Sequence, residues 1–206
     1  MSGSGDSLPA LVASRICHDL INPVSAIGNG VELLAMIAAP GPEMALITES
    51  VNNAIARIRF FRIAFGAPAP GQLIGRAEIV ATLDTLSHGG RTHYDWRPTE
   101  DQPRDALRLV YLLLQCVETA LPQGGDVVIL GSGAEWRIEA SARRIRLDSD
   151  AWACLTDTVP MPPPDPGQVQ FPLAAAALAA SGGQLGLEAC ATHLALEVSS
   201  GSCRPR

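Results

Sequence analysis

The N-terminal part of the chain repeats apolar residues at alternating steps of three and four. The first series is Ala13, Cys17, Leu20, Val24, Ile27, Val31, Leu34 and Ala38, and the second is Met44, Ile47, Val51, Ala54, Ile58, Phe61 and Phe65. Such spacing places apolar side chains along one side of a helix, so it predicts two long helices. Pro40-Gly41-Pro42 interrupts the pattern between the two series, and Gly66 follows the second. The two helices are therefore expected to form an antiparallel hairpin.

A single hairpin does not bury both apolar seams well. Two hairpins from two copies of the chain would close into a four-helix bundle with a central core. The alternative is that the seams pack against the rest of the same chain. The regularity of the three-and-four spacing favours bundle packing, so we expect a homodimer.

Beyond residues 67–71, a Pro-, Ala- and Gly-rich linker, the pattern changes. The linker predicts a division into a hairpin domain at residues 1–66 and a second domain at residues 72–206. In the second part, predicted helices at 75–86, 103–121, 149–155 and 171–180 interleave with predicted strands at 92–96, 126–130, 135–140, 144–147, 184–189 and 193–198. Residues 159–167 are proline-rich and irregular. The fold class is therefore α+β, with a helical hairpin followed by an α/β sandwich.

The composition of the chain excludes several classes of protein and of reaction. The chain has 206 residues, a net charge of −6, 47% hydrophobic and 17% charged residues, and arginine at all 15 Lys or Arg positions. It is too apolar for a disordered protein, and the lack of lysine excludes lysine Schiff bases. The acidic balance argues against a nucleic-acid partner, because such partners need clustered positive charge.

The sequence also points to a compartment. Residues 1–7 have no basic or apolar run typical of a signal peptide, and the longest uninterrupted apolar stretch, residues 171–180, is about half of a membrane span. The five cysteines are scattered and form no C-x-x-C pair, which is typical of reduced thiols. We therefore expect a cytoplasmic protein without a membrane segment.

The most informative position on the first helix is His18. It lies one residue off the apolar seam and so should face outward, on one stripe with Leu11, Arg15, Asn22, Ser25 and Asn29. Gly28 and Gly30 lie beside this stripe, and each costs a helix interior about 1 kcal/mol relative to alanine. The close approach of another backbone or a partner would account for them. The alternative is an ordinary solvated face that carries a histidine by chance.

The run His18-Asp19-Leu20-Ile21-Asn22-Pro23 resembles the phospho-acceptor box of sensor histidine kinases, in which His, an acidic residue, Leu, any residue, Thr or Asn, and Pro follow one another. A proline inside a helix costs about 3 kcal/mol, so Pro23 is not a neutral choice. In those kinases the box lies on the first helix of a dimeric phosphotransfer hairpin. The predicted hairpin and the second domain thus resemble that family in architecture as well as in motif.

The second domain resembles a degenerate kinase ATPase domain. Gln115 and Thr119 stand where kinases carry a pair of asparagines that hold ATP and magnesium, the Asp-x-Gly-x-Gly box is missing, and prolines replace the glycine-rich lid. A hairpin with this box fused to such a domain is similar to the ChpT family, the dimeric histidine phosphotransferases of alphaproteobacterial phosphorelays. Val169-Gln170-Phe171 adds to the similarity.

The resemblance implies that the protein takes a phosphoryl group from the receiver domain of a hybrid histidine kinase. It would pass the group to response regulators, including a transcription factor of the CtrA type. Neutral His18 would be the nucleophile, Asn22 would orient the phosphoryl group, and Asp19 would act through an intermediary or as a base. The expected partner contacts are Arg15, Ser25 and Asn29. The resemblance implies no cofactor of the protein's own, with Mg²⁺ supplied by the receiver.

Three other functions remain open on the sequence: a divergent ATP-using kinase, a non-catalytic dimeric module that sequesters a regulator, and a net phosphatase. Whether the protein counts as an enzyme is uncertain, but we expect a phosphotransfer protein rather than an ATP-dependent kinase.

Overall fold

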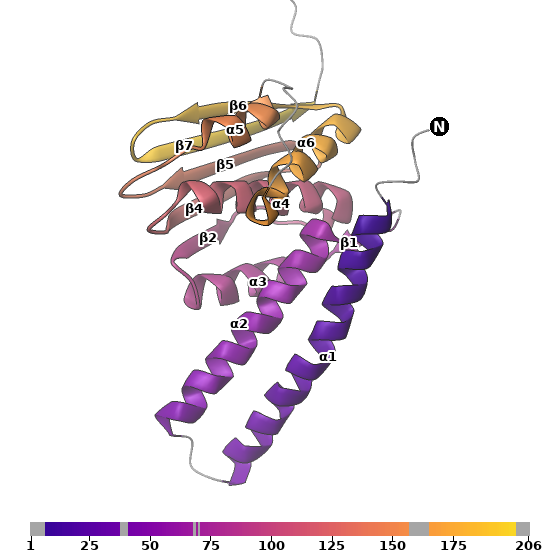
Figure 1. Cartoon of the computed structure of the whole chain (residues 1–206), viewed down its shortest axis with the longest axis vertical. Coiled ribbons are helices and arrows are strands. Elements are labelled where there is room, and N and C mark those ends of the chain that lie inside the picture. Colours follow the sequence, from indigo (N-terminus) through magenta and orange to yellow (C-terminus); the bar gives the residue numbers. More distant parts are fainter. Residues whose placement is uncertain (1–6, 38–40, 68, 70, 157–164, 201–206) are drawn as a thin grey trace, which may run out of the picture.

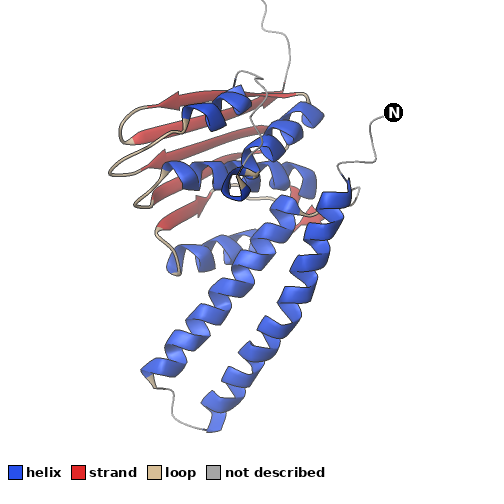
Figure 2. Cartoon of the chain, viewed as in Figure 1, coloured by secondary structure: helices blue, strands red, loops and turns tan. Residues whose placement is uncertain are grey.

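A helical hairpin precedes a sheet covered by helices (Figures 1 and 2). The structure is a computed structural model that describes residues 7–37, 41–67, 69, 71–156 and 165–200. Helix α1 spans Ser7–Ile37 and helix α2 spans Pro42–Phe65. They run antiparallel along each other, which confirms the predicted hairpin and the mixed helix-and-sheet fold class.

The second part of the chain is built around a five-stranded sheet of order β2-β4-β5-β7-β6. The strands are β2 (Thr92–Trp96), β4 (Gly125–Ser132), β5 (Glu135–Ser141), β6 (Gly183–Ala189) and β7 (His193–Ser200), and the helices are α3 (Arg76–His88), α4 (Arg104–Ala120), α5 (Ser149–Thr156) and α6 (Gln170–Ser181). Strands β2 and β4 pair in parallel and the other neighbours pair antiparallel. The helices gather on one face of the sheet (Figure 2).

Helix α4 is the centre of the core, and every residue from 109 to 117 is buried. A helix that is buried all round needs neighbours on every side. One of these neighbours is the C-terminal half of α2, where Phe60 is fully buried and stacks on Tyr111 with ring centroids 4.3 Å apart. Ile63 and Ala64 of α2 belong to the same core cluster. The hairpin is thus joined to the sheet through α2.

Most of the predicted elements are confirmed, but one strand is wrong. Residues 144–147 form no strand, because their backbone is used elsewhere: the Ile145 amide donates to the Ala191 carbonyl and the Arg146 amide to the Ala120 carbonyl. The short strands β1 (Leu73–Ile74) and β3 (Gln102–Pro103) pair antiparallel, and a 3-10 turn covers Pro166–Gln168. None of these three elements was predicted.

Some predicted features lie outside the described residues. These are Ala38 and Pro40 at the hairpin turn, Pro68 and Pro70 of the linker, and most of the proline-rich stretch, residues 159–164. The division into domains 1–66 and 72–206 stays a prediction.

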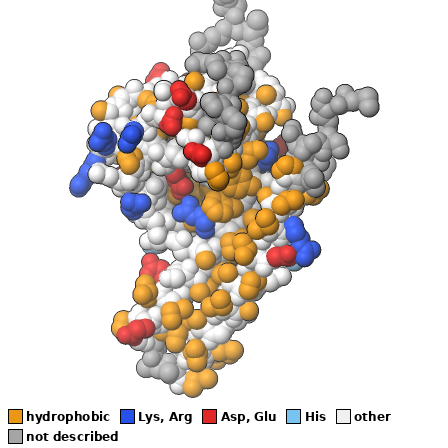
Figure 3. All heavy atoms as spheres, in the orientation of Figure 1, with side chains coloured by type: hydrophobic (Ala, Val, Ile, Leu, Met, Phe, Trp, Pro, Cys, Tyr) orange, Lys and Arg blue, Asp and Glu red, His pale blue; other side chains and the backbone are white. Residues whose placement is uncertain are grey.

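In each helix of the hairpin, some residues of the apolar seam are buried or half-buried against the rest of the chain and others face solvent. On α1, Cys17 and Val31 are buried, whereas Leu20, Ile27 and Leu34 are 48%, 55% and 54% exposed. We call these three residues, together with Ile47 of α2, which is 46% exposed, the open apolar face of the hairpin. Apolar side chains run along the hairpin in Figure 3.

Helix α1 is apolar along most of its length. The helical segment Pro9–Ile37 is long and apolar enough to cross a bilayer by length and composition alone, with a mean hydropathy of 1.4 in its most apolar window. Polar residues such as Arg15, His18 and Asp19 interrupt this segment, so it contains no long uninterrupted apolar run. The same criterion is met by helices that pack against other helices, so on its own it is weak evidence for a membrane.

Candidate functional site

His18 lies on the outer side of α1, and its side chain is 69% exposed. Pro23 lies inside the same helix, five residues further on. Because proline has no N–H, the carbonyl of Asp19 loses its usual helical donor beside the histidine. The outward direction predicted from the seam is confirmed. The imidazole is therefore open to solvent.

Asp19 contacts the imidazole directly, so it needs no intermediary to orient the ring, and its alternative role as a base stays a prediction. Its Oδ1 lies 3.2 Å from His18 Nδ1, and its Oδ2 accepts a 2.7 Å hydrogen bond from Arg15 Nε. Adjacent helix positions point about 100° apart, but these side chains are long enough to turn toward each other. Arg15 is therefore engaged with Asp19 within the chain.

This geometry sets the chemistry of the ring. A carboxylate at Nδ1 favours the tautomer with its proton on that atom, which leaves Nε2 with the free lone pair. The hydrogen bond from His18, followed by that from Arg15, holds the pKa of Asp19 below its usual range. The carboxylate is thus charged at neutral pH, and Nε2 is the atom available as a nucleophile.

The other stripe residues occupy the expected side of α1. Asn22 and Asn29 are exposed, Ser25 is half-buried and Leu11 is 55% exposed. The structure brings Arg15, His18 and Asp19 into contact. The roles proposed for Asn22, Ser25 and Asn29 stay predictions.

The glycines beside the stripe differ from each other. A Cβ on Gly28 would lie 3.2 Å from Val51 Cγ1, so the close approach of α2 explains this glycine. A Cβ on Gly30 would meet nothing within 4 Å. Among the described residues there is therefore no packing reason for Gly30.

Two of the other three histidines, His88 and His193, make local contacts. His88 Nδ1 lies 2.7 Å from the Asp84 carbonyl, and His193 Nδ1 lies 3.4 Å from Ser141 Oγ. Within the described part of the chain, no three His, Cys, Asp or Glu side chains come together in a way that could hold a metal ion.

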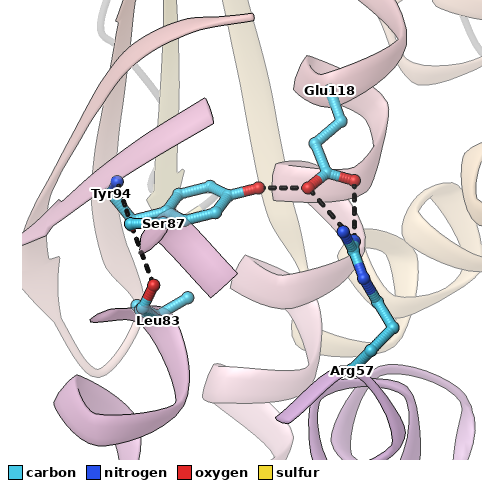
Figure 4. A network of polar contacts seen from close by, with 5 residues as sticks. All are labelled: Arg57, Leu83, Ser87, Tyr94 and Glu118. Atoms are coloured by element: carbon cyan, nitrogen blue, oxygen red, sulfur yellow. Dashed lines mark hydrogen bonds and ion pairs between the residues drawn. The ribbon is translucent and has the colours of Figure 1, made fainter. Parts of the chain in front are cut away.

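Helix α4 lacks polar groups directed at a ligand where the resemblance places the kinase asparagines. Gln115 is buried in the core, and the Thr119 hydroxyl donates to the Cys116 carbonyl of its own helix at 2.7 Å. The neighbouring Glu118 belongs to a contact network that the sequence analysis missed. It accepts hydrogen bonds from Tyr94 of β2 and Arg57 of α2 (Figure 4).

A cavity of about 820 Å³ lies between α2 and α3, and its lining includes Asn52, Asn53 and Thr85 but not His18. His18 therefore lies on an exposed helix surface, away from this cavity.

The chain is similar to several known proteins. The family described as histidine phosphotransferase C-terminal domain matches residues 76–192. The protein phosphotransferase ChpT of Brucella abortus (strain 2308) is 34% identical over 171 residues, which cover 79% of this chain and 81% of that protein. A solved structure described as a bacterial phosphotransferase superposes with a TM-score of 0.67 at 26% identity, over 97% of this chain and 98% of the other. A histidine kinase domain from Erythrobacter litoralis covers 92% of both chains at 13% identity and a TM-score of 0.44.

Proposed function

The chain belongs to the histidine phosphotransferase family, and from this premise we propose that it relays a phosphoryl group between the receiver-domain aspartates of two partner proteins through His18. The observation that carries the proposal is the exposed imidazole whose Nδ1 faces Asp19 at 3.2 Å. Nε2 is then free to attack, and the exposed helix surface leaves room for a whole receiver domain to approach.

The transfer step balances without an external proton. The Nε2 lone pair attacks the phosphorus of the aspartyl phosphate, the P–N bond forms, and the P–O bond to the aspartate breaks. The receiver's carboxylate leaves, and the ring becomes a cation that keeps its proton on Nδ1. The same step in reverse delivers the group to a second aspartate.

Asp19 stabilises the loaded ring. When Nε2 carries the phosphoryl group, the positive charge on the imidazole lies next to the Asp19 carboxylate, so their attraction favours the loaded form. Arg15 holds the other oxygen of Asp19 at 2.7 Å and so keeps the carboxylate turned toward the ring. Asn22, one helical turn from His18, is on the right side to orient the phosphoryl group.

We assign no nucleotide or metal cofactor to the chain itself, and Mg²⁺ would come with the receiver. Support comes from α4, where Gln115 is buried and the Thr119 hydroxyl is bonded within its own helix. Neither side chain is placed to bind a phosphate-bound metal ion. Titration calorimetry with MgATP tests the divergent-kinase alternative: heat of saturable binding would favour it.

The open apolar face supports a homodimer with a four-helix bundle. Leu20, Ile27 and Leu34 repeat every seven residues, which is the spacing of a helix-helix contact. A Cβ placed at Gly30 would meet nothing within 4 Å in one chain, so a second copy could approach the helix backbone at this glycine. The charged pair of Arg15 and Asp19 on the same helix disfavours a bilayer as the covering surface.

The partners follow from the site and from the ChpT relative. We expect the receiver of a hybrid histidine kinase as donor, CtrA-like response regulators as acceptors, no nucleic-acid or membrane partner, and a cytoplasmic location. The relay direction depends on which receiver is supplied with phosphate.

The test is a two-receiver relay. A radiolabelled donor receiver, freed of its kinase and ATP, is mixed with the protein and an unphosphorylated acceptor receiver. Wild type should carry label to the acceptor, His18→Ala should not, and the control His88→Ala should behave as wild type. Unchanged relay by His18→Ala refutes the proposal and favours a sequestering module, whereas release of label mainly to water, dependent on Asn22, favours a net phosphatase.

A further inference from the structure

A polar cluster joins the hairpin to the sheet in the C-terminal half of α2. Arg57 Nη1 lies 3.4 Å from both carboxylate oxygens of Glu118 on α4, and the Tyr94 hydroxyl of β2 donates to the same carboxylate. Figure 4 shows the side chains of Tyr94 and Arg57 converging on Glu118. The Tyr94 amide donates to Ser87 Oγ at 2.9 Å, and Ser87 Oγ donates to the Leu83 carbonyl of α3. One cluster therefore connects α2, α3, α4 and β2.

The cluster is more enclosed than an ordinary surface ion pair. The side chain of Glu118 is 28% exposed, that of Arg57 is 36% exposed, and Tyr94 is 8% exposed overall. Burial, then the adjacent Glu118 charge, raises the pKa of Tyr94, so its hydroxyl stays a donor over the physiological range. A carboxylate with little access to water is costly unless it is paired, so Glu118 depends on both of its partners.

The chain offers a second ion pair across the same boundary for comparison. Arg62 of α2 and Glu78 of α3 are 3.9 Å apart, and their side chains are 46% and 43% exposed. A pair of this kind contributes little, because water screens it and both side chains lose freedom. The Arg57–Glu118 pair has better burial and an additional donor.

The location of the cluster gives it a role in presenting His18. Helix α1, which carries His18, packs along α2, and the cluster fixes α2 to the sheet (Figure 1). A change in the angle between α2 and α4 would therefore move His18 relative to the whole sheet. Displacing a reacting group by about 1 Å can cost about a hundred-fold in rate.

We propose that Arg57, Glu118 and Tyr94 are positioning residues that hold the hairpin and the sheet in one fixed arrangement, so that a docked receiver meets His18 at a constant angle. This inference rests on the proposed function. Glu118 would then orient the hairpin. By the resemblance, the corresponding helix of histidine kinases binds nucleotide instead.

Two transfer assays separate positioning from chemistry. The first loads His18 from phosphoramidate, a small donor that needs no docking surface. The second loads His18 from a phosphorylated receiver domain. For Glu118→Gln, which keeps the shape of the side chain but removes its charge, the KM for the receiver should rise about three- to ten-fold, the range expected from losing a coupled pair. Loading from phosphoramidate should stay within about two-fold of wild type, because His18 and Asp19 are untouched.

The matched control is Glu78→Gln, which makes the same charge change at the more exposed pair and should leave both assays unchanged. Tyr94→Phe removes only the hydroxyl and should give a smaller rise in the KM for the receiver. If Glu118→Gln does not fold, this variant tests the inference in its place. Hydrogen exchange of the full chain gives a readout independent of transfer: amides at the contact of α2 and α4 should exchange faster in Glu118→Gln, while those of β5 and β7 should not.

Unchanged exchange together with unchanged receiver KM in Glu118→Gln overturns the inference, as does an equal loss in both loading assays. A wild-type protein that accepts no phosphate at His18 from either donor refutes the proposed function instead, and the exchange result then still decides whether the cluster fixes α2.

Discussion

Replacing Ile27 by serine should weaken self-association of the chain. Ile27 is 55% exposed in one copy and lies at the centre of the open apolar face. In the proposed homodimer this exposed part is covered by the second hairpin. Serine removes the apolar surface and adds a hydroxyl that has to find a partner at the interface.

The magnitude follows from the exposed fraction. Burying a whole isoleucine side chain is worth about 1.5–3 kcal/mol, so covering roughly half of Ile27 contributes about 0.8–1.5 kcal/mol per copy. A two-fold symmetric dimer contains the contact twice, which gives a loss of about 1.5–3 kcal/mol. At about 1.4 kcal/mol per ten-fold, the dimer dissociation constant should rise about 10- to 140-fold.

Sedimentation equilibrium over a range of protein concentrations measures this constant. The matched control is Leu33→Ser, on the same helix and 61% exposed, but off the three-and-four spacing. It should leave the dissociation constant near that of wild type. Equal effects of the two substitutions, or a wild type that stays a 21.6 kDa monomer at micromolar concentration, would refute the argument for a seam-mediated dimer.

Four further substitutions test the fold and the site. Phe60→Ala removes a fully buried ring and should lower the free energy of unfolding by about 3–5 kcal/mol in urea titration. Gly124 and Gly133 both have positive φ, but a Cβ on Gly124 would lie 1.9 Å from a backbone carbonyl oxygen whereas one on Gly133 meets nothing within 4 Å. Alanine should therefore destabilise by more at Gly124 than at Gly133, where only strain of about 1 kcal/mol applies. Asp19→Asn should slow loading of His18 from a receiver without changing the melting temperature, because the pair is exposed; since the pKa of Asp19 lies below its usual range, the wild-type advantage should persist as pH falls from 8 to 5.

Periodicity was sufficient to predict the long elements. The heptad spacing predicted both hairpin helices, and the alternating pattern in Thr92–Trp96 predicted β2 with its observed bounds. Residues 144–147 alternate in the same way but pair with no strand, because hydrogen bonds to Ala120 and Ala191 hold them in an irregular path. Strands of two residues, such as β1 and β3, are too short to produce a periodic signal.

The site was predicted in outline, and its contacts were not. The box around His18 and its outward direction follow from local sequence, since both depend on residues a few positions apart. The contact between Asp19 and His18 depends on side-chain torsions that a helical wheel does not contain. Arg57 and Glu118 are 61 positions apart, so only the packing of α2 on α4 brings them together. No local pattern predicts such a pair.

The most direct test of the account is to identify the residue that carries phosphate after the protein is mixed with a phosphorylated receiver domain. Peptide mass spectrometry under alkaline conditions, which preserve phosphohistidine, should find the phosphoryl group on the peptide containing His18, and the modification should be lost on brief acid treatment. Phosphate on the peptide containing His88, His93 or His193, or on no peptide while the receiver is still dephosphorylated, would contradict the central claim.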